Sequence, residues 1–247
     1  MEHVQYLPNY KKDFEQAEWL YCESSHYIFR YFTDSLAEKD IEKIIIRQEN
    51  TFKKILSFLN LPAPREKIKY YLYPNREIKR NLMGDDWYAQ AIYNDFIIHA
   101  LYSETDKVIG EHEDTHLLSL PWGLSVGFIQ EGLAEYMVGH SWRGESLDQK
   151  SREGLKNKIP IFVTSMMFHQ VWLNTPDDIA VYYYAYAGSF VSFLVNQFGK
   201  EKFEELYKNT SRKFSAKKNT NVFNSIYNKP LEDIEDNWKR YITIVPE

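Results

Sequence analysis

The chain has 247 residues but a single cysteine, Cys22, so it forms no intrachain disulfide and contains no Cys-x-x-Cys motif. It lacks any run of about 20 apolar residues, and the sequence therefore predicts no membrane span. Its first residues lack the basic start and apolar core of a signal peptide. From these absences we expect a cytoplasmic protein.

The chain also lacks a surplus of basic residues, because 30 Lys and Arg against 35 Asp and Glu give a formal net charge of -5. Proteins that bind nucleic acids usually carry a basic patch or stripe, so nucleic acid is not expected as a partner. The most basic stretch, residues 208–218, is mixed with Ser, Thr and Phe, and we interpret it as a solvated face.

What the chain does contain is typical of a globular protein with a substantial core, since 44% of its residues are hydrophobic and 26% are charged. The alternation and composition of its first hundred residues predict short strands and one long helix. The strands are expected at residues 27–32, 68–73, 87–93 and 96–101, and the helix at residues 35–60. Helices are expected after that, opening at Ser103-x-x-Asp106, near Val126 and at Thr175-Pro176.

This order predicts an α+β fold in which a small mixed β-sheet with a long helix precedes a mostly helical part. We expect a single zincin-like catalytic unit over residues 1–247. It would comprise a β-rich lobe over about 1–102 and a helical lobe over about 103–247 that carries the functional site.

The string His112-Glu113-Asp114-Thr115-His116 has the His-Glu-x-x-His pattern. On a helix, residues four apart share a face, so both imidazoles can reach one metal ion. Glu113 is offset by one residue, where a general base for a metal-activated water should lie. The pattern predicts a zinc site.

A catalytic zinc ion needs a third protein ligand, and Glu131 in the segment Gln130–Tyr136 offers a carboxylate. The stretch from Pro121 to Gly127 allows the chain to turn back toward the histidines. Glu135 lies one helical turn after Glu131 and is suited to accept the second N–H of an imidazole that binds the metal.

The chain resembles the gluzincin zinc metallopeptidases, through His-Glu-x-x-His followed by Glu131-Gly-x-Ala-Glu-Tyr136. Among these thermolysin-like and aminopeptidase N-like enzymes, it is most similar to the smaller peptidase MA-like domains. The resemblance covers about residues 25–242, and also involves the segments Pro121–Tyr136 and Tyr184–Gly199.

The resemblance implies a metallopeptidase that holds one Zn²⁺ per chain and acts on a peptide or protein substrate. It implies that His112, His116 and Glu131 bind the metal, that Glu113 is the base and that Glu135 supports the ligands. It further implies that Tyr184, in a cluster with Tyr182, Tyr183 and Tyr186, steadies the oxyanion. A strand near residues 89–96 would be the edge that pairs with an extended peptide.

Three features depart from the family pattern. The spacing to Glu131 is shorter than in well-studied gluzincins, Asp114 is polar where relatives carry an apolar residue, and Gly110 is expected inside the ligand helix. His99, His140 and His169 are interpreted as packed or surface residues, with His140 as the reserve ligand if Glu131 is not one.

Two other functions remain open at this stage. The first is a catalytically inactive, peptidase-like module that binds metal and interacts with a partner. The second is a helical interaction protein without metal.

Overall fold

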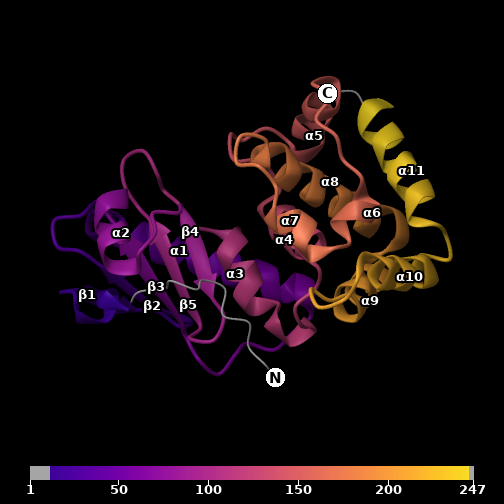
Figure 1. Ribbon diagram of the computed structural model, residues 1–247. Coiled ribbons are helices and arrows are strands. Elements are labelled where there is room, and N and C mark those ends of the chain that lie inside the picture. The colour runs from indigo at the N-terminus through magenta and orange to yellow at the C-terminus, as the bar shows by residue number, and fades with distance from the viewer. Residues whose placement is uncertain (1–11, 245–247) are drawn as a thin grey trace. The chain divides into compact units, whose positions relative to one another are not determined.

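The computed structural model describes residues 12–244, and the chain divides into two compact units, Met1–Ser119 and Leu120–Glu247. The first unit contains a mixed sheet with helices, and the second consists of helices (Figure 1). This confirms the α+β prediction of a small mixed sheet followed by a helical part. The more detailed expectation of one catalytic unit stays a prediction.

The sheet of the first unit has the strand order β1-β2-β3-β5-β4. Its strands are β1 (Leu20–Glu23), β2 (Tyr27–Tyr31), β3 (Ile68–Tyr73), β4 (Ala89–Ile92) and β5 (Ile97–Leu101). The pairs β2–β3 and β3–β5 are parallel, whereas β1–β2 and β4–β5 are antiparallel. The four expected strands are confirmed, β4 with a later start and an earlier end than expected, and β4 forms one edge of the sheet.

Helix α1 (Leu36–Leu59) packs against one face of the sheet. Ser35 caps it by accepting a hydrogen bond from the Glu38 N–H at 3.2 Å. The phenol oxygen of Tyr27 on β2 lies 3.1 Å from the Gln48 carbonyl oxygen, and the Tyr27 ring lies 5.9 Å from that of Phe52. The long helix is therefore confirmed within one residue at each end.

The opposite face of the sheet is covered by η1 (Asp13–Gln16) and α2 (Arg76–Met83). Successive strand residues point to opposite faces, so Tyr71 and Tyr73 lie on this side while Tyr70 faces α1. Phe14 and Met83 are fully buried with them in one cluster. Both faces are thus apolar, as expected for a sheet that lies between helices.

Helix α3 (Glu111–Leu118), which carries the His-Glu-x-x-His string, begins later than expected. The Ser103 hydroxyl does accept a hydrogen bond from the Asp106 N–H, at 3.0 Å, but it closes a turn and not a helix. An isolated antiparallel bridge between Tyr102 and Lys107 closes the same turn. Gly110 is the N-cap at φ 127°, so the expectation that it lies inside the helix is wrong.

The second unit is built around α8, which packs against α4, α5, α9 and α11. Its elements are η2 (Leu120–Trp122), α4 (Gly127–Val138), α5 (Leu147–Lys156), α6 (Val163–Met166), α7 (His169–Leu173), α8 (Ala180–Phe198), α9 (Lys200–Asn209), α10 (Ala216–Tyr227) and α11 (Leu231–Ile244). Helix α4 is confirmed with its Gly139 C-cap. The expected helix start at Thr175-Pro176 is wrong, because these residues form turns that precede α8.

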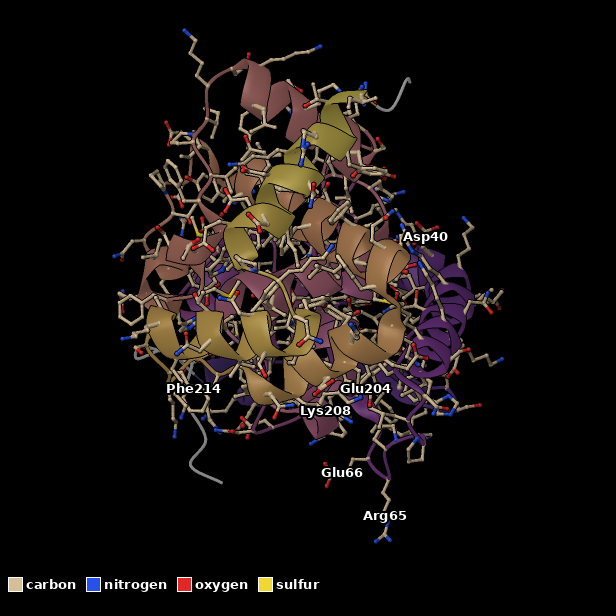
Figure 2. The ribbon with its side chains drawn as sticks, turned by 90° about the vertical axis from the view of Figure 1, so that its right-hand side faces the viewer. Asp40, Arg65, Glu66, Glu204, Lys208 and Phe214 are labelled. Atoms are coloured by element: carbon tan, nitrogen blue, oxygen red, sulfur yellow. The ribbon has the colours of Figure 1, made fainter. Side chains whose placement is uncertain are left out.

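The basic stretch 208–218 is largely solvated, as expected. Lys208 and Glu204, labelled in Figure 2, form an ion pair on α9 at 2.5 Å. Lys218 lies over the ring of Phe214. Arg212 differs, because it donates to the Gln130 side chain at 2.7 Å and its burial lowers its pKa to about 9. Arg212 thus ties this segment to α4.

Between residues 12 and 244, no helix combines the length and the apolar composition that crossing a membrane requires.

Helices α4 and α8 approach each other closely at two glycines. A Cβ on Gly132 would lie 2.7 Å from the Ala187 carbonyl oxygen and 2.6 Å from a Val191 methyl group. A Cβ on Gly188 would lie 2.6 Å from the Glu135 Cβ. Such distances leave no room for a side chain, so the two glycines set the separation of the helices.

We expect Gly132→Ala to destabilise the protein, because the new methyl group would overlap a backbone oxygen that cannot move alone. Overpacking of this kind costs about 1–3 kcal/mol, more than the gain in helix propensity. Chemical denaturation measures the free energy of unfolding. Asn196→Ala, at an exposed position of α8, is the matched control and should change it by less than about 0.5 kcal/mol. Equal stabilities of the two variants would contradict the close packing.

Candidate metal centre

Helix α3 brings the two histidines of the motif together. The Nε2 atoms of His112 and His116 lie 3.3 Å apart, and the ring planes are nearly perpendicular at 83°. His116 is buried, and the ring of Tyr93 lies 6.2 Å from it. The expectation that both imidazoles share one face of a helix is confirmed.

The separation of the two nitrogens fits a shared metal ion. Two nitrogens at roughly 2.0–2.1 Å from a tetrahedral zinc ion are about 3.3 Å apart, which equals the observed distance. The same separation also suits an N–H···N hydrogen bond when one ring carries the proton. The pair is therefore arranged to share a proton or an ion without any change of rotamer.

Asp114 points away from the histidines, into the first unit. Its carboxylate is fully buried, and one oxygen accepts hydrogen bonds from the Tyr27 phenol and from the Gln48 amide at 3.1 Å. The other oxygen has no hydrogen-bond partner, and burial raises the pKa of Asp114 well above its usual value. The polar residue that departs from the family pattern thus anchors α3 to β2 and α1.

Glu113 is partly exposed, and its charge acts on buried groups on the sheet side of α3. Burial lowers the pKa of Lys79, and the carboxylates of Asp85 and Glu113 partly offset this. The Lys79 ammonium donates to Asp85 at 2.5 Å and to the Gln90 side chain at 3.2 Å. Burial also raises the pKa of Tyr70, and the charges of Asp114 and Glu113 raise it further.

In the second unit, α4 carries Glu131 and Glu135 one helical turn apart, so the two carboxylates share a face. Glu131 is partly exposed, whereas Glu135 is buried against Gly188 of α8. The imidazole of His169 on α7 lies near this face. Burial lowers the pKa of His169, and the charge of Glu131 only partly offsets this lowering.

His169 is a residue whose position the sequence did not indicate. A Cβ on Gly127 of α4 would lie 2.8 Å from the His169 Nδ1, so the imidazole packs directly on the helix that carries Glu131. Helix α7 has only five residues and shows no helical periodicity of its own. No local signal in the sequence could therefore have associated His169 with Glu131.

The tyrosine cluster on α8 divides into two groups. Three of the hydroxyls donate hydrogen bonds within the second unit: Tyr182 to the Glu153 carboxylate at 2.8 Å, Tyr183 to the Pro160 carbonyl at 2.7 Å and Tyr186 to the Ile159 carbonyl at 3.0 Å. The ring of Tyr184 lies between those of Trp142 and Trp172. Tyr184 also shares a face of α8 with Gly188, four residues later, which contacts Glu135. Its role in steadying an oxyanion stays a prediction.

Two further histidines are packed or bonded locally, as expected. His99 on β5 is fully buried, its Nδ1 lies 2.9 Å from the Tyr73 hydroxyl, and burial lowers its pKa well below the usual value. His140 is exposed, and its Nδ1 donates to the Ser141 carbonyl at 2.9 Å.

The comparisons with known proteins add no family assignment. No protein-family model matches the chain, and no curated protein gives a significant match.

Proposed function

We propose that the chain is a zinc-dependent metallopeptidase of the gluzincin type, in which His112, His116 and Glu131 bind one Zn²⁺ and Glu113 is the general base. The observation that carries this proposal is the 3.3 Å separation of the two histidine nitrogens on α3. In this proposal His112 and His116 of the first unit and Glu131 of the second each offer one ligand atom to the ion.

The donor set favours zinc. Two imidazoles and one carboxylate are the ligands of catalytic zinc sites that keep a fourth position open. Oxygen-rich sites suit Mg²⁺ and Ca²⁺ instead, and sites rich in thiolate suit structural zinc, Cu(I) or iron–sulfur clusters. Because the chain has a single cysteine, a thiolate cluster within one chain is excluded.

In the proposed mechanism, Glu113 takes a proton from the attacking water and passes it to the leaving amine nitrogen as the C–N bond breaks. A bound zinc ion would supply the Lewis acid that polarises the substrate carbonyl and lowers the pKa of a water. Glu135 would accept the second N–H of a ligand imidazole and so keep its orientation. The Tyr184 hydroxyl would donate to the carbonyl oxygen as that oxygen gains negative charge.

The substrate in this proposal is a peptide or protein. The cytoplasmic location expected from the sequence stays a prediction.

We expect His112→Ala and Glu131→Ala each to weaken zinc binding by more than about 100-fold, because a lost ligand should cost at least as much as a lost supporting residue. Equilibrium dialysis with elemental analysis measures the affinity and should give one zinc per chain for the wild type. His140→Ala is the matched control, since His140 is exposed and bonded within its own turn. If His140→Ala lost the metal and Glu131→Ala kept it, His140 would be the third ligand.

We expect Glu113→Gln to keep its zinc and to lower kcat by about 100-fold or more, because the amide cannot accept the proton. Turnover of a broad peptide library by zinc-loaded protein is the measurement. Glu111→Gln removes a carboxylate from the same turn of α3, where Glu111 pairs with Lys54 at 3.0 Å, and should leave kcat within about twofold.

A wild-type protein that binds zinc but cleaves no peptide would favour the inactive, metal-binding module. Equal turnover by wild type and Glu113→Gln would remove Glu113 from the mechanism.

A further inference from the structure

The outer face of α1 lines a pocket that the proposed mechanism does not use, which we call the α1 pocket. Its volume is about 490 Å³, and sites that hold small organic ligands measure roughly 300–1,000 Å³. Its lining includes Lys43, Ile46, Arg47, Asn50 and Lys54 of α1 together with Glu111, the first residue of α3. The pocket therefore lies wholly within the first unit.

The lining of the α1 pocket is basic. Lys43, Arg47, Asn50 and Lys54 follow one another at intervals of three or four residues, so they share one face of α1. The three cations among them face one carboxylate, Glu111, which leaves two positive charges in excess. Because the whole chain has a formal net charge of -5, this local excess marks a place where an anion is attracted.

The guanidinium of Arg47 is fixed at the wall of the pocket. A Cβ on Gly110 would lie 3.0 Å from the Arg47 Nη2, so the guanidinium packs on the backbone that precedes α3. Arg65 contrasts with it, because its side chain extends from a loop into solvent (Figure 2). The missing side chain at Gly110 thus gives Arg47 a defined position beside the pocket.

The cations of the pocket differ in what they already bind. Lys43 pairs with Asp40 at 2.9 Å and Lys54 with Glu111 at 3.0 Å, whereas within residues 12–244 Arg47 forms no ion pair. Ion pairs of exposed lysines are weak, and the side chains are flexible, so both ammonium groups can turn to a more strongly charged anion. Arg47 can bind such an anion without giving up a partner.

The number and kind of these donors select a phosphate group. A guanidinium fits phosphate or carboxylate oxygens with two parallel hydrogen bonds. A carboxylate brings one charge and two oxygens, whereas a phosphate group brings up to two charges and three acceptor oxygens, enough for one arginine and two lysines. Ile46, which is 64% exposed, offers an apolar contact to the rest of the ligand.

We propose that the α1 pocket binds the phosphate group of an organic ligand, with Arg47 as the bidentate donor and Lys43 and Lys54 as the flanking charges. The ligand is a soluble phosphate compound or a lipid with a phosphate headgroup, since the recognised group is the same. This proposal does not depend on the zinc site.

The test is isothermal titration calorimetry of the full chain with pyrophosphate, without added metal and at low ionic strength, where screening is weak. Arg47→Gln should weaken binding by about tenfold or more, because a hydrogen-bonded charge pair is lost. Lys53→Gln, at an exposed position of α1 outside the lining, and Arg65→Gln are the matched controls and should stay within about twofold of the wild type.

Two further arms identify the ligand and the site. Sedimentation with vesicles of phosphatidylcholine that contain phosphatidic acid tests the lipid source, and Arg47-dependent binding to these vesicles without pyrophosphate binding would assign the phosphate to a headgroup. His112→Ala should bind pyrophosphate as the wild type does, because the pocket does not include the histidines.

Four outcomes would overturn the proposal. These are the absence of binding to both pyrophosphate and the vesicles, equal weakening by Arg47→Gln and Arg65→Gln, loss of pyrophosphate binding in His112→Ala, and binding of citrate as tight as that of pyrophosphate. Citrate carries several negative charges on carboxylates, so the last result would show that the pocket recognises charge and not phosphate.

Discussion

The orientation of α3 depends on the buried carboxylate of Asp114. A helix turns by about 100° per residue, so Asp114 lies about 160° around α3 from His112 and from His116. Hydrogen bonds from Tyr27 and Gln48 draw Asp114 into the first unit and so turn both imidazoles to the other side of the helix. A buried carboxylate without these donors would be costly, which makes the Tyr27–Gln48–Asp114 group decisive for any chemistry of the histidine pair.

The sequence predicted those parts of the fold in which one local pattern decides the outcome. Helix α1 has a capping serine and apolar residues at helical spacing, and strands β2 and β3 are β-prone runs that end at turns. The predicted start of α3 was wrong because the Ser103 hydroxyl accepts a hydrogen bond from the Asp106 N–H in a turn, just as it would in a capping box. A bridge between Tyr102 and Lys107 closes that turn, and the Tyr102 N–H donates to the Tyr73 carbonyl at 2.8 Å, a contact between distant residues that no local pattern encodes.

The histidine pair could be predicted from one helix, whereas the packing between separate helices of the second unit could not. The spacing of His112 and His116 is sufficient to bring their nitrogens together. In contrast, the tyrosines of α8 differ in the hydrogen-bond acceptors that their hydroxyls meet. The carbonyls of Ile159 and Pro160 are two of these acceptors, and they lie on a segment distant in the sequence. The proximity of His169 to α4 likewise comes from packing between helices that are distant in the sequence.

One face of α4 positions Glu131 in the second unit. Gly127, Glu131 and Glu135 follow one another at intervals of four residues and therefore share one face. The missing side chain at Gly127 admits the Trp172 ring, while Glu135 contacts α8 at Gly188, the second place where a glycine leaves room. Glu131 lies between these two contacts, so its backbone is held from both sides while its side chain stays partly exposed. Because the backbone of Glu131 is already held, only its side-chain rotamer would have to be ordered if it bound the proposed zinc ion.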